Sequence, residues 1–421
     1  MPFRFVHTAD IHLDSPLRSL ALRNGELADL IGSATRQALE AIVDLCLAEQ
    51  VDALIIAGDL YDGDQTSMKT ARFLASEMER LSQAGIQVFT IRGNHDALSK
   101  ITKELVLPPS VKIFGAHAEA VEFNAGNLPV AIHGLSFARP QAPESLLARY
   151  KRPISGAINI GIMHTSLAGS PGHDVYAPCN VGDLHGFGFH YWALGHIHQR
   201  ADHQGSASVI MPGMPQGRDI NEAGPKSVSL VTIADDGTIT VKEVLTSIAQ
   251  FERVDVDLTG LEDWRDVADA IETSLSRRRG LTPSPHLVAR LRIAGQTSMS
   301  WQLRRDADVL RTQAEQRGER VGSTWIEKIE LAVQPIAETG LKSADPVMEL
   351  EGLMREDVLA RPGFRDEIAA IVRALLPDIP AESRQFAGTD DAAFEAFIDR
   401  LLQDGVEEIV ARMTVGAERD S

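Results

Sequence analysis

Short apolar blocks alternate with amphipathic segments along the first 245 residues. Three apolar runs predict strands, at residues 3–10, 51–62 and 86–96. Apolar side chains at helical spacing predict a helix in each gap between them, at residues 33–50 and 68–85. Ser33 or Thr35 is the expected N-cap of the first helix, and Gly85 closes the second. This order of elements predicts an α/β sheet, and later apolar runs predict further strands at 129–137, 157–163, 191–195, 207–211 and 227–233.

The pattern restarts near residue 250. Strands are expected at 251–258, 286–293 and 325–333, with helices at 262–278 and 300–317 between them. The chain thus divides into a first domain over 1–245, a small α/β domain over 250–334 and a helical C-terminal region over 346–415. The last predicted helix has an apolar face formed by Ala393, Phe394, Phe397, Ile398, Leu401, Leu402, Ile409 and Val410. Such a face either packs on its own domain or docks onto a partner helix.

The composition is that of a folded globular protein. A length of 421 residues indicates two or three domains, and 44% hydrophobic with 24% charged residues excludes a disordered chain. No apolar run is long enough for a bilayer, and no signal-peptide pattern is visible. The two cysteines, Cys46 and Cys179, show no metal-type spacing. The expected location is the cytoplasm, away from any membrane.

The net charge of −18 argues against a protein that holds DNA by itself over a wide surface. Residues 341–421 contain eighteen Asp or Glu and nine Lys or Arg, so about a fifth of the chain carries half of the net charge. The acidity is weaker elsewhere, and a partner could supply a basic surface.

Five predicted strands of the first domain end in residue types that bind metals. They lead into Asp10 and His12, Asp59 and Asp62, Asn94 with His95 and Asp96, His164, and His196 with His198. Ligands of open α/β sheets bind beyond the carboxyl ends of the strands, so these groups are expected to converge in one crevice. A polar loop accounts for each residue alone, whereas five such strand ends together favour a metal site.

The candidate donors are carboxylate or amide oxygens and imidazole nitrogens, without thiolates. This set suits Mn²⁺, Fe²⁺ or Zn²⁺ and differs from a structural zinc finger. The candidate ligands are Asp10, His12, Asp59, Asn94, His164, His196 and His198. Seven ligands suit two metals that share a carboxylate, the arrangement used for in-line displacement at phosphorus. Gly58, Gly93 and Gly195 each precede a ligand, where a sharp turn or a close approach requires glycine.

At these motifs the sequence resembles the calcineurin-like binuclear metallophosphoesterases, whose signature is D-x-H, G-D-x-x-D, G-N-H-D/E, an isolated His and G-H-x-H. All five occur here in the family's order. The resemblance implies one metal on Asp10, His12, Asp59 and His198, and a second on Asp59, Asn94, His164 and His196. It implies that His95 stabilises the transition state and protonates the leaving oxygen, and that Asp96 orients His95 through a hydrogen bond. It also implies an α/β metallophosphoesterase sandwich with αββα layers and mixed sheets, followed by a small capping domain and a helical tail.

Residues 193–201 and 210–233 resemble the bacterial DNA-repair exonucleases of the SbcD and YhaO type, and residues 172–184 resemble YhaO-like members in particular. The resemblance implies DNA as substrate and two divalent ions, with Mn²⁺ as the expected metal. It implies that the C-terminal helical region binds an SbcC-like or YhaN-like coiled-coil ATPase, and a homodimer is a further expectation. Asp62 stands where archaeal relatives have a His, and His190 stands where an Asp is frequent, so His190 is assigned only a structural role.

Several other polar residues leave alternatives open. His173 and Tyr176 either face the substrate or belong to a long loop without a role. Arg218 either contacts phosphate or forms a surface salt bridge. Four histidines are expected to be hydrogen-bonded residues rather than ligands: His7, His117, His133 and His185.

The sequence therefore favours a metal-dependent DNA nuclease in which a dimetal-bound hydroxide attacks phosphorus in line. A phosphatase or phosphodiesterase for small nucleotides or other small phosphoesters is the alternative, since the ligands would be the same. The extra domains count against that alternative. A non-catalytic scaffold is least favoured, because it would have no use for the complete ligand set and His95.

Overall fold

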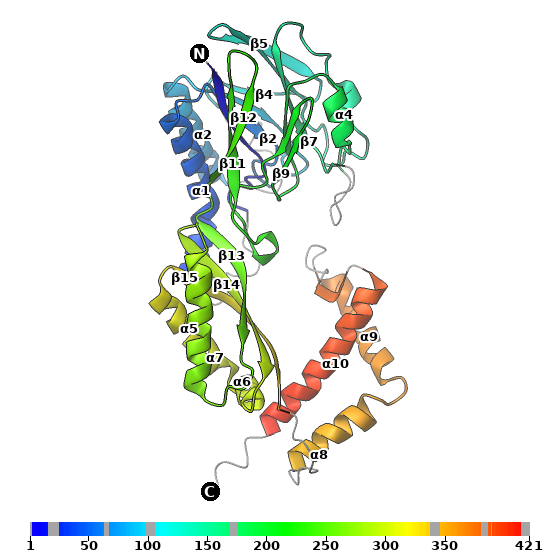
Figure 1. The fold of residues 1–421 in the computed structure, drawn as a ribbon. Helices are drawn as coiled ribbons and strands as arrows, with labels where there is room; N and C mark the ends of the chain where they lie inside the picture. The colour runs from blue at the N-terminus through cyan, green and yellow to red at the C-terminus, as the bar shows by residue number, and fades with distance from the viewer. Residues whose placement is uncertain are drawn as a thin grey trace. The chain divides into compact units, whose positions relative to one another are not determined.

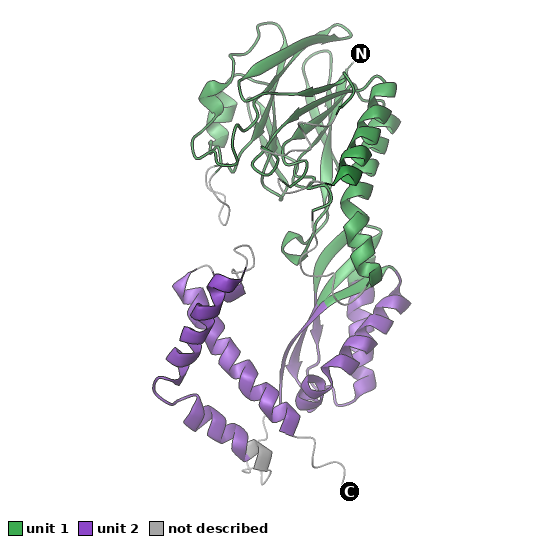
Figure 2. Cartoon of the chain, turned by 180° about the vertical axis from the view of Figure 1, so that it is seen from behind, with its two compact units in different colours: residues 1–253, 278–290, 323–327 green, residues 254–277, 291–322, 328–421 purple. Residues whose placement is uncertain are grey.

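The computed structural model describes residues 2–15, 25–62, 67–97, 106–167, 176–336, 346–379, 386–388 and 390–413. The chain forms two compact units (Figure 2). The first contains residues 1–253, 278–290 and 323–327, and the second contains residues 254–277, 291–322 and 328–421. Among the described residues, every helix is too short or too polar for the hydrophobic interior of a bilayer.

Two six-stranded mixed sheets form the centre of the first unit (Figure 1). The first sheet has the order β12-β11-β1-β2-β3-β4. Its strands are β1 (Phe3–Thr8), β2 (Ala53–Ala57), β3 (Gln87–Ile91), β4 (Val111–Ile113), β11 (Ser227–Ile233) and β12 (Ile239–Leu245). β1 to β4 are parallel to one another, whereas β11 runs antiparallel to both β1 and β12.

The second sheet has the order β5-β6-β7-β8-β10-β9. Its strands are β5 (Glu119–Ala125), β6 (Leu128–Gly134), β7 (Ile158–His164), β8 (Tyr191–Gly195), β9 (Ala201–Gln204) and β10 (Ser208–Met211). The four strands β6, β7, β8 and β10 are parallel, and antiparallel strands close both edges. This fold is the predicted α/β sandwich of two mixed sheets.

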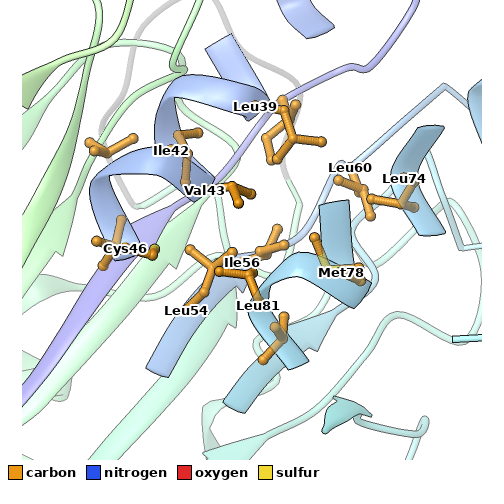
Figure 3. Packing of buried hydrophobic residues seen from close by; sticks show 14 of the residues in the cluster. Leu39, Ile42, Val43, Cys46, Leu54, Ile56, Leu60, Leu74, Met78 and Leu81 are labelled. Atoms are coloured by element: carbon orange, nitrogen blue, oxygen red, sulfur yellow. The ribbon is translucent and has the colours of Figure 1, made fainter. Parts of the chain in front are cut away.

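The alternation of side chains along the strands builds the layers. In β1, Val6 faces the helices α1 (Gly25–Ala48) and α2 (Met68–Gln83), whereas Phe5 faces the second sheet. Figure 3 shows side chains of both helices packed over Leu54 and Ile56 of β2. The outer face of the second sheet is covered by the short helices η1 (Leu147–Arg149) and α4 (Val181–Gly186) and by the loops around them. The layers are therefore αββα, as predicted.

Helix α1 spans Gly25–Ala48 among the described residues, so Ser33 and Thr35 lie inside the helix and the prediction of an N-cap at either is wrong. The Ser33 hydroxyl instead donates to the Asp29 carbonyl within the helix. The earlier start has a tertiary cause, because Leu27 and Ile31 are buried against Phe251 and neighbouring apolar residues.

Residues 249–334 form a three-stranded sheet of order β13-β14-β15 with helices between its strands. The elements are β13 (Ala249–Asp257), α5 (Trp264–Gly280), β14 (His286–Gln296), α6 (Ser300–Arg305), α7 (Ala307–Val321) and β15 (Thr324–Gln334). Two helices separated at Asp306 replace the single helix expected over 300–317.

The described part of the C-terminal region is helical. It contains α8 (Pro346–Leu353), a π-helical turn η3 (Met354–Val358), α9 (Phe364–Leu375), a 3₁₀ turn η4 (Leu376–Asp378) and α10 (Asp391–Met413). Phe394 and Ile398 of α10 are buried in a cluster that includes Ala369 of α9. The other half of α10 packs on α6, where Glu407 pairs with Arg304. The chain itself therefore covers part of the apolar face, while Leu401 and Ile409 remain exposed.

Candidate dimetal centre

The seven predicted ligands converge at one edge of the sandwich. Asp10 and His12 follow β1, Asp59 follows β2, Asn94 follows β3, His164 ends β7, and His196 and His198 follow β8. All these strands are parallel within their sheets, so their carboxyl ends meet at the same crevice.

One group of ligand atoms comes from Asp10, His12 and His198, which offer atoms within 4.8 Å of one another. The two Nε2 atoms of His12 and His198 face each other at 3.3 Å. Asp10 is fully buried, and its two oxygens accept the backbone N–H of His196 at 3.1 and 2.9 Å. The end of β1 is thereby tied to the end of β8.

A second group comes from Asp59, His164 and His196. The Nε2 atom of His164 lies 3.3 Å from Asp59 Oδ2 and 2.9 Å from Asn94 Oδ1. The Nδ1 atom of His196 lies 3.2 Å from the same Asn94 oxygen. The four residues proposed for the second metal therefore gather their donor atoms around one point.

The chemistry of these donors fits divalent cations. Asp10 and Asp59 are both almost completely buried, and a buried carboxylate requires a compensating positive charge. Burial raises the pKa of Asp10 to about 6, even though His164 and His198 act against it. His164 is also buried, which lowers its pKa, but Asp59, Asp10 and the Ala57 carbonyl together raise it to about 9. Cations bound here would displace these protons and supply the missing charge.

Backbone geometry brings the ligands inward. Asp10, His12 and Asp59 have φ values of 52°, 45° and 51°, in the left-handed region that non-glycine residues seldom adopt. A Cβ on Gly93 would lie 2.3 Å from Asp59 Oδ1, and one on Gly195 would lie 2.1 Å from the Ala57 carbonyl oxygen. The close approach inferred from the sequence at these two glycines is therefore confirmed.

Each of three imidazoles has an oxygen partner on Nδ1, which leaves its Nε2 for a metal. His12 contacts Asp62 at 2.8 Å, His198 contacts Glu222 at 2.8 Å, and His164 contacts the Ala57 carbonyl at 2.9 Å. Such contacts fix the tautomer and orientation of a ligating histidine. Sequence reasoning missed Glu222, because 24 residues separate it from His198 and no spacing connects the two.

His95 lies beside the first group, but its predicted partner is wrong. Its Nδ1 lies 2.9 Å from Asp62 Oδ1, and this hydrogen bond raises the pKa of His95 above its usual value. Asp96 instead accepts the backbone N–H groups of Gly93 at 2.7 Å and Leu60 at 3.0 Å. The carboxylate that orients His95 is therefore Asp62, and Asp96 holds the loops that carry Asp59 and Asn94.

The alternatives left open by the sequence have different outcomes. Arg218 pairs with Glu222 at 2.7 Å, so it forms the salt bridge that was one of its two expected roles, and its side chain is partly buried. The Tyr176 ring lies 5.0 Å from the His196 ring, at the edge of the crevice. His173 lies outside the described residues. His190 accepts the backbone N–H of Asn159, in the structural role expected for it.

Oxygen and imidazole donors gather in two groups at the ends of parallel strands, with His95 beside the first group. Such a donor set is typical of a dimetal phosphoesterase. Residues 3–200 match the calcineurin-like phosphoesterase family, and residues 251–334 match the middle domain of the metallophosphoesterase YhaO. The chain belongs to the calcineurin-like metallophosphoesterase family, whose members use two divalent metals.

Among curated proteins, the chain is 34% identical over 281 residues to the uncharacterized metallophosphoesterase YhaO of Bacillus subtilis, covering 65% of this chain and 68% of that protein. It is 25% identical over 309 residues to the SbcD component of the nuclease SbcCD from Escherichia coli K12, covering 63% of this chain and 75% of that protein. It is 26% identical over 220 residues to the DNA double-strand break repair protein Mre11 of Sulfurisphaera tokodaii, where the match covers 50% of this chain and 54% of that protein.

Proposed function

We propose that this chain is a metal-dependent nuclease that hydrolyses DNA phosphodiesters in DNA repair. The observation that carries the proposal is the convergence of all seven donor side chains, with His95 beside them, in a chain similar to the SbcD component of the nuclease SbcCD. The O and N donors suit Mn²⁺ as the working metal.

In this proposal, Asp10, His12, Asp59 and His198 hold one cation, and Asp59, Asn94, His164 and His196 hold the other. When bound, the two cations would supply Lewis-acid stabilisation of the phosphate oxygens and a water of lowered pKa.

His95 has the second part in the proposed reaction. Asp62 accepts a hydrogen bond from its Nδ1, which directs Nε2 away from that carboxylate. The His95 side chain is 46% exposed, so Nε2 can reach a substrate oxygen in the crevice. His95 then donates the proton to the departing oxygen.

We also propose that the C-terminal helical region docks onto an SbcC-like or YhaN-like coiled-coil ATPase. Four apolar side chains of α9 and α10 that the chain leaves largely exposed support this proposal: Ile371, Leu375, Leu401 and Ile409. Exposed apolar groups on neighbouring helices are suited to helix-to-helix docking.

An assay with Mn²⁺ tests the substrate class. Single-stranded DNA, duplex DNA with free ends, bis(p-nitrophenyl) phosphate and p-nitrophenyl phosphate are compared, with Asp59→Ala as the metal-site control. We expect hydrolysis of the diester and of DNA, and none by the variant. Hydrolysis of small phosphoesters alone, with DNA left intact both with and without an ATPase partner, would favour the small-phosphoester enzyme instead.

A further inference from the structure

A cavity of about 670 Å³ adjoins the candidate dimetal centre and shares only His198 with its seven candidate ligands. Three segments line it, at residues 198–200, 212–214 and 221–227. His198 belongs to both places, because its Nε2 faces His12 while the residue also lines the cavity. Gly213 has a φ of 74°, and a Cβ there would lie 2.9 Å from the His198 carbonyl oxygen, so glycine permits the close packing of two of these segments.

Lys226 is a buried cation in the cavity wall. It is only 9% exposed, and its Nζ donates one hydrogen bond, to the Ala223 carbonyl at 3.3 Å. No carboxylate among the described residues lies within 4.0 Å of this ammonium. Burial lowers the pKa of Lys226, although the more distant Glu222 and Glu252 raise it. A buried ammonium without an ion-pair partner is costly, and an anion in the cavity would remove that cost.

Arg200 adds a second cation to the same wall. Its Nη1 donates to the Ser229 hydroxyl at 2.9 Å, and its paired carboxylate, on Glu243, stays 3.9 Å from Nε. The carboxylate that does line the cavity, Glu222, is already bound to His198 and Arg218. In a chain with a net charge of −18, this wall presents two cations whose charge nearby carboxylates do not fully compensate.

We propose that this cavity binds the phosphate next to the scissile phosphodiester along a polynucleotide strand, with Lys226 and Arg200 as its cationic contacts. The inference rests on the proposed nuclease function and names a determinant of its substrate class. A strand carries a phosphate on every nucleotide, so a strand bound at the dimetal centre presents its next phosphate to the adjoining wall. A phosphoester with a single phosphate has no such second group and gains nothing from the two cations.

Two pairs of chromogenic substrates test the proposal with Mn²⁺ present. The first pair is thymidine 5′-(p-nitrophenyl phosphate) with and without a 3′-phosphate, and the second is the 3′-(p-nitrophenyl phosphate) with and without a 5′-phosphate. The wild-type protein is expected to prefer the doubly phosphorylated member of one pair. In Lys226→Met the preference for the doubly phosphorylated substrate is expected to fall about tenfold. The KM for that substrate rises because a charge-assisted hydrogen bond to its second phosphate is lost. Lys242→Met, which removes an exposed lysine of β12, serves as the control and keeps the preference.

A second measurement needs neither turnover nor bound metal. The binding constant for oligothymidylate is measured in EDTA at several salt concentrations. The slope of its logarithm against the logarithm of the salt concentration is expected to be smaller in magnitude by about one for Lys226→Met than for the wild type, since one phosphate contact is removed. Thermal melting confirms that the variant folds, and Arg200→Gln repeats the test at the second cation of the cavity.

The outcomes separate this inference from the proposed function. No preference for the doubly phosphorylated substrate in either pair, or a preference that Lys226→Met retains in full, overturns the phosphate site while phosphodiester hydrolysis stands. Wild-type protein that hydrolyses p-nitrophenyl phosphate but neither thymidine diester overturns the nuclease proposal itself.

Discussion

Asp62 supports one proposed metal ligand and the proposed general acid with the same carboxylate oxygen. Oδ1 lies 2.8 Å from His12 Nδ1 and 2.9 Å from His95 Nδ1. Loss of the partner behind a ligating histidine costs about 10–100-fold in metal affinity, or about 1.4–2.7 kcal/mol. A positioned general acid contributes about 10²–10⁴-fold to a rate, which is the upper limit of what Asp62 can add through His95. We therefore expect Asp62→Ala to weaken both metal binding and turnover.

A double-mutant cycle with His95→Ala separates the two effects. Metal affinity is measured by calorimetry, and turnover of a DNA oligonucleotide, whose departing alkoxide oxygen needs a proton, is measured with Mn²⁺ in saturating excess. His95→Ala is expected to lower turnover by about 10²–10⁴-fold, to a rate that is still measurable, while both metals stay bound. The double variant is expected to match His95→Ala in turnover and Asp62→Ala in metal affinity, since Asp62 acts on the rate through His95 and on the metal through His12. Ser15→Ala removes the other hydrogen-bond partner of Asp62 and is the matched control, with little change expected in either quantity.

The cycle has a clear contrary result. Losses of turnover that add up in the double variant would mean that Asp62 does not act through His95. Wild-type metal affinity in Asp62→Ala would mean that the His12 contact has no role in holding the ligand.

Three further changes test the site and the core. Asp59→Ala is expected to lose metal at both positions, and elemental analysis that finds one metal held at full affinity would contradict the shared ligand. Gly195→Ala places a Cβ 2.1 Å from the Ala57 carbonyl oxygen. It is expected to lower the free energy of unfolding, measured in urea, by at least about 1–3 kcal/mol. Gly182→Ala is the control and is expected to change it little, because the space around Gly182 is open. Burial lowers the pKa of His7 from 6.5 to about 3. The neutral form is therefore favoured in the folded protein. The contribution of His7 to the free energy of unfolding is complete above pH 6.5 and is lost as the pH falls toward 3. Between pH 7 and 5 the wild type should lose about 2 kcal/mol more than His7→Gln, and parallel urea-unfolding profiles for the two proteins would refute this.

The sequence pattern predicted the sheets well where strands are buried on both faces. Residues 53–57, for example, are all apolar, and all five side chains are buried, so the sequence indicates a strand there without ambiguity. It failed for β5 and β12, whose residues are only partly buried at the edges of their sheets and carry a mixed pattern. It also missed the first turns of α1, because Leu27 and Ile31 gain their burial from residues more than 200 positions away.

The donor residues could be found from the sequence because each follows a strand and the strands are parallel. Their supports could not. Asp62 is only three positions from Asp59, yet its hydrogen bonds to His12 and His95 depend on where β1 and β3 end in space. Glu222 and Arg218 reach the site from a turn before β11, and local sequence holds no signal for a contact with His198.

The backbone at three of the candidate ligands is strained, and contacts within the fold impose this strain. Left-handed φ values at Asp10, His12 and Asp59 cost about 1–2 kcal/mol each for such residues, and they persist only when the surroundings impose them. Here the surroundings include backbone hydrogen bonds, because the Asp10 N–H donates to the Gly58 carbonyl and the His12 N–H donates to the Asp59 carbonyl, both at 3.1 Å. The carboxylates are also held, since the backbone N–H of His196 donates to Asp10 and that of His95 donates to Asp59. These bonds hold each carboxylate in place whether or not a metal is present. The free energy of orienting the donors is therefore supplied by folding of the sandwich, so cation binding need only overcome the displacement of protons and of water.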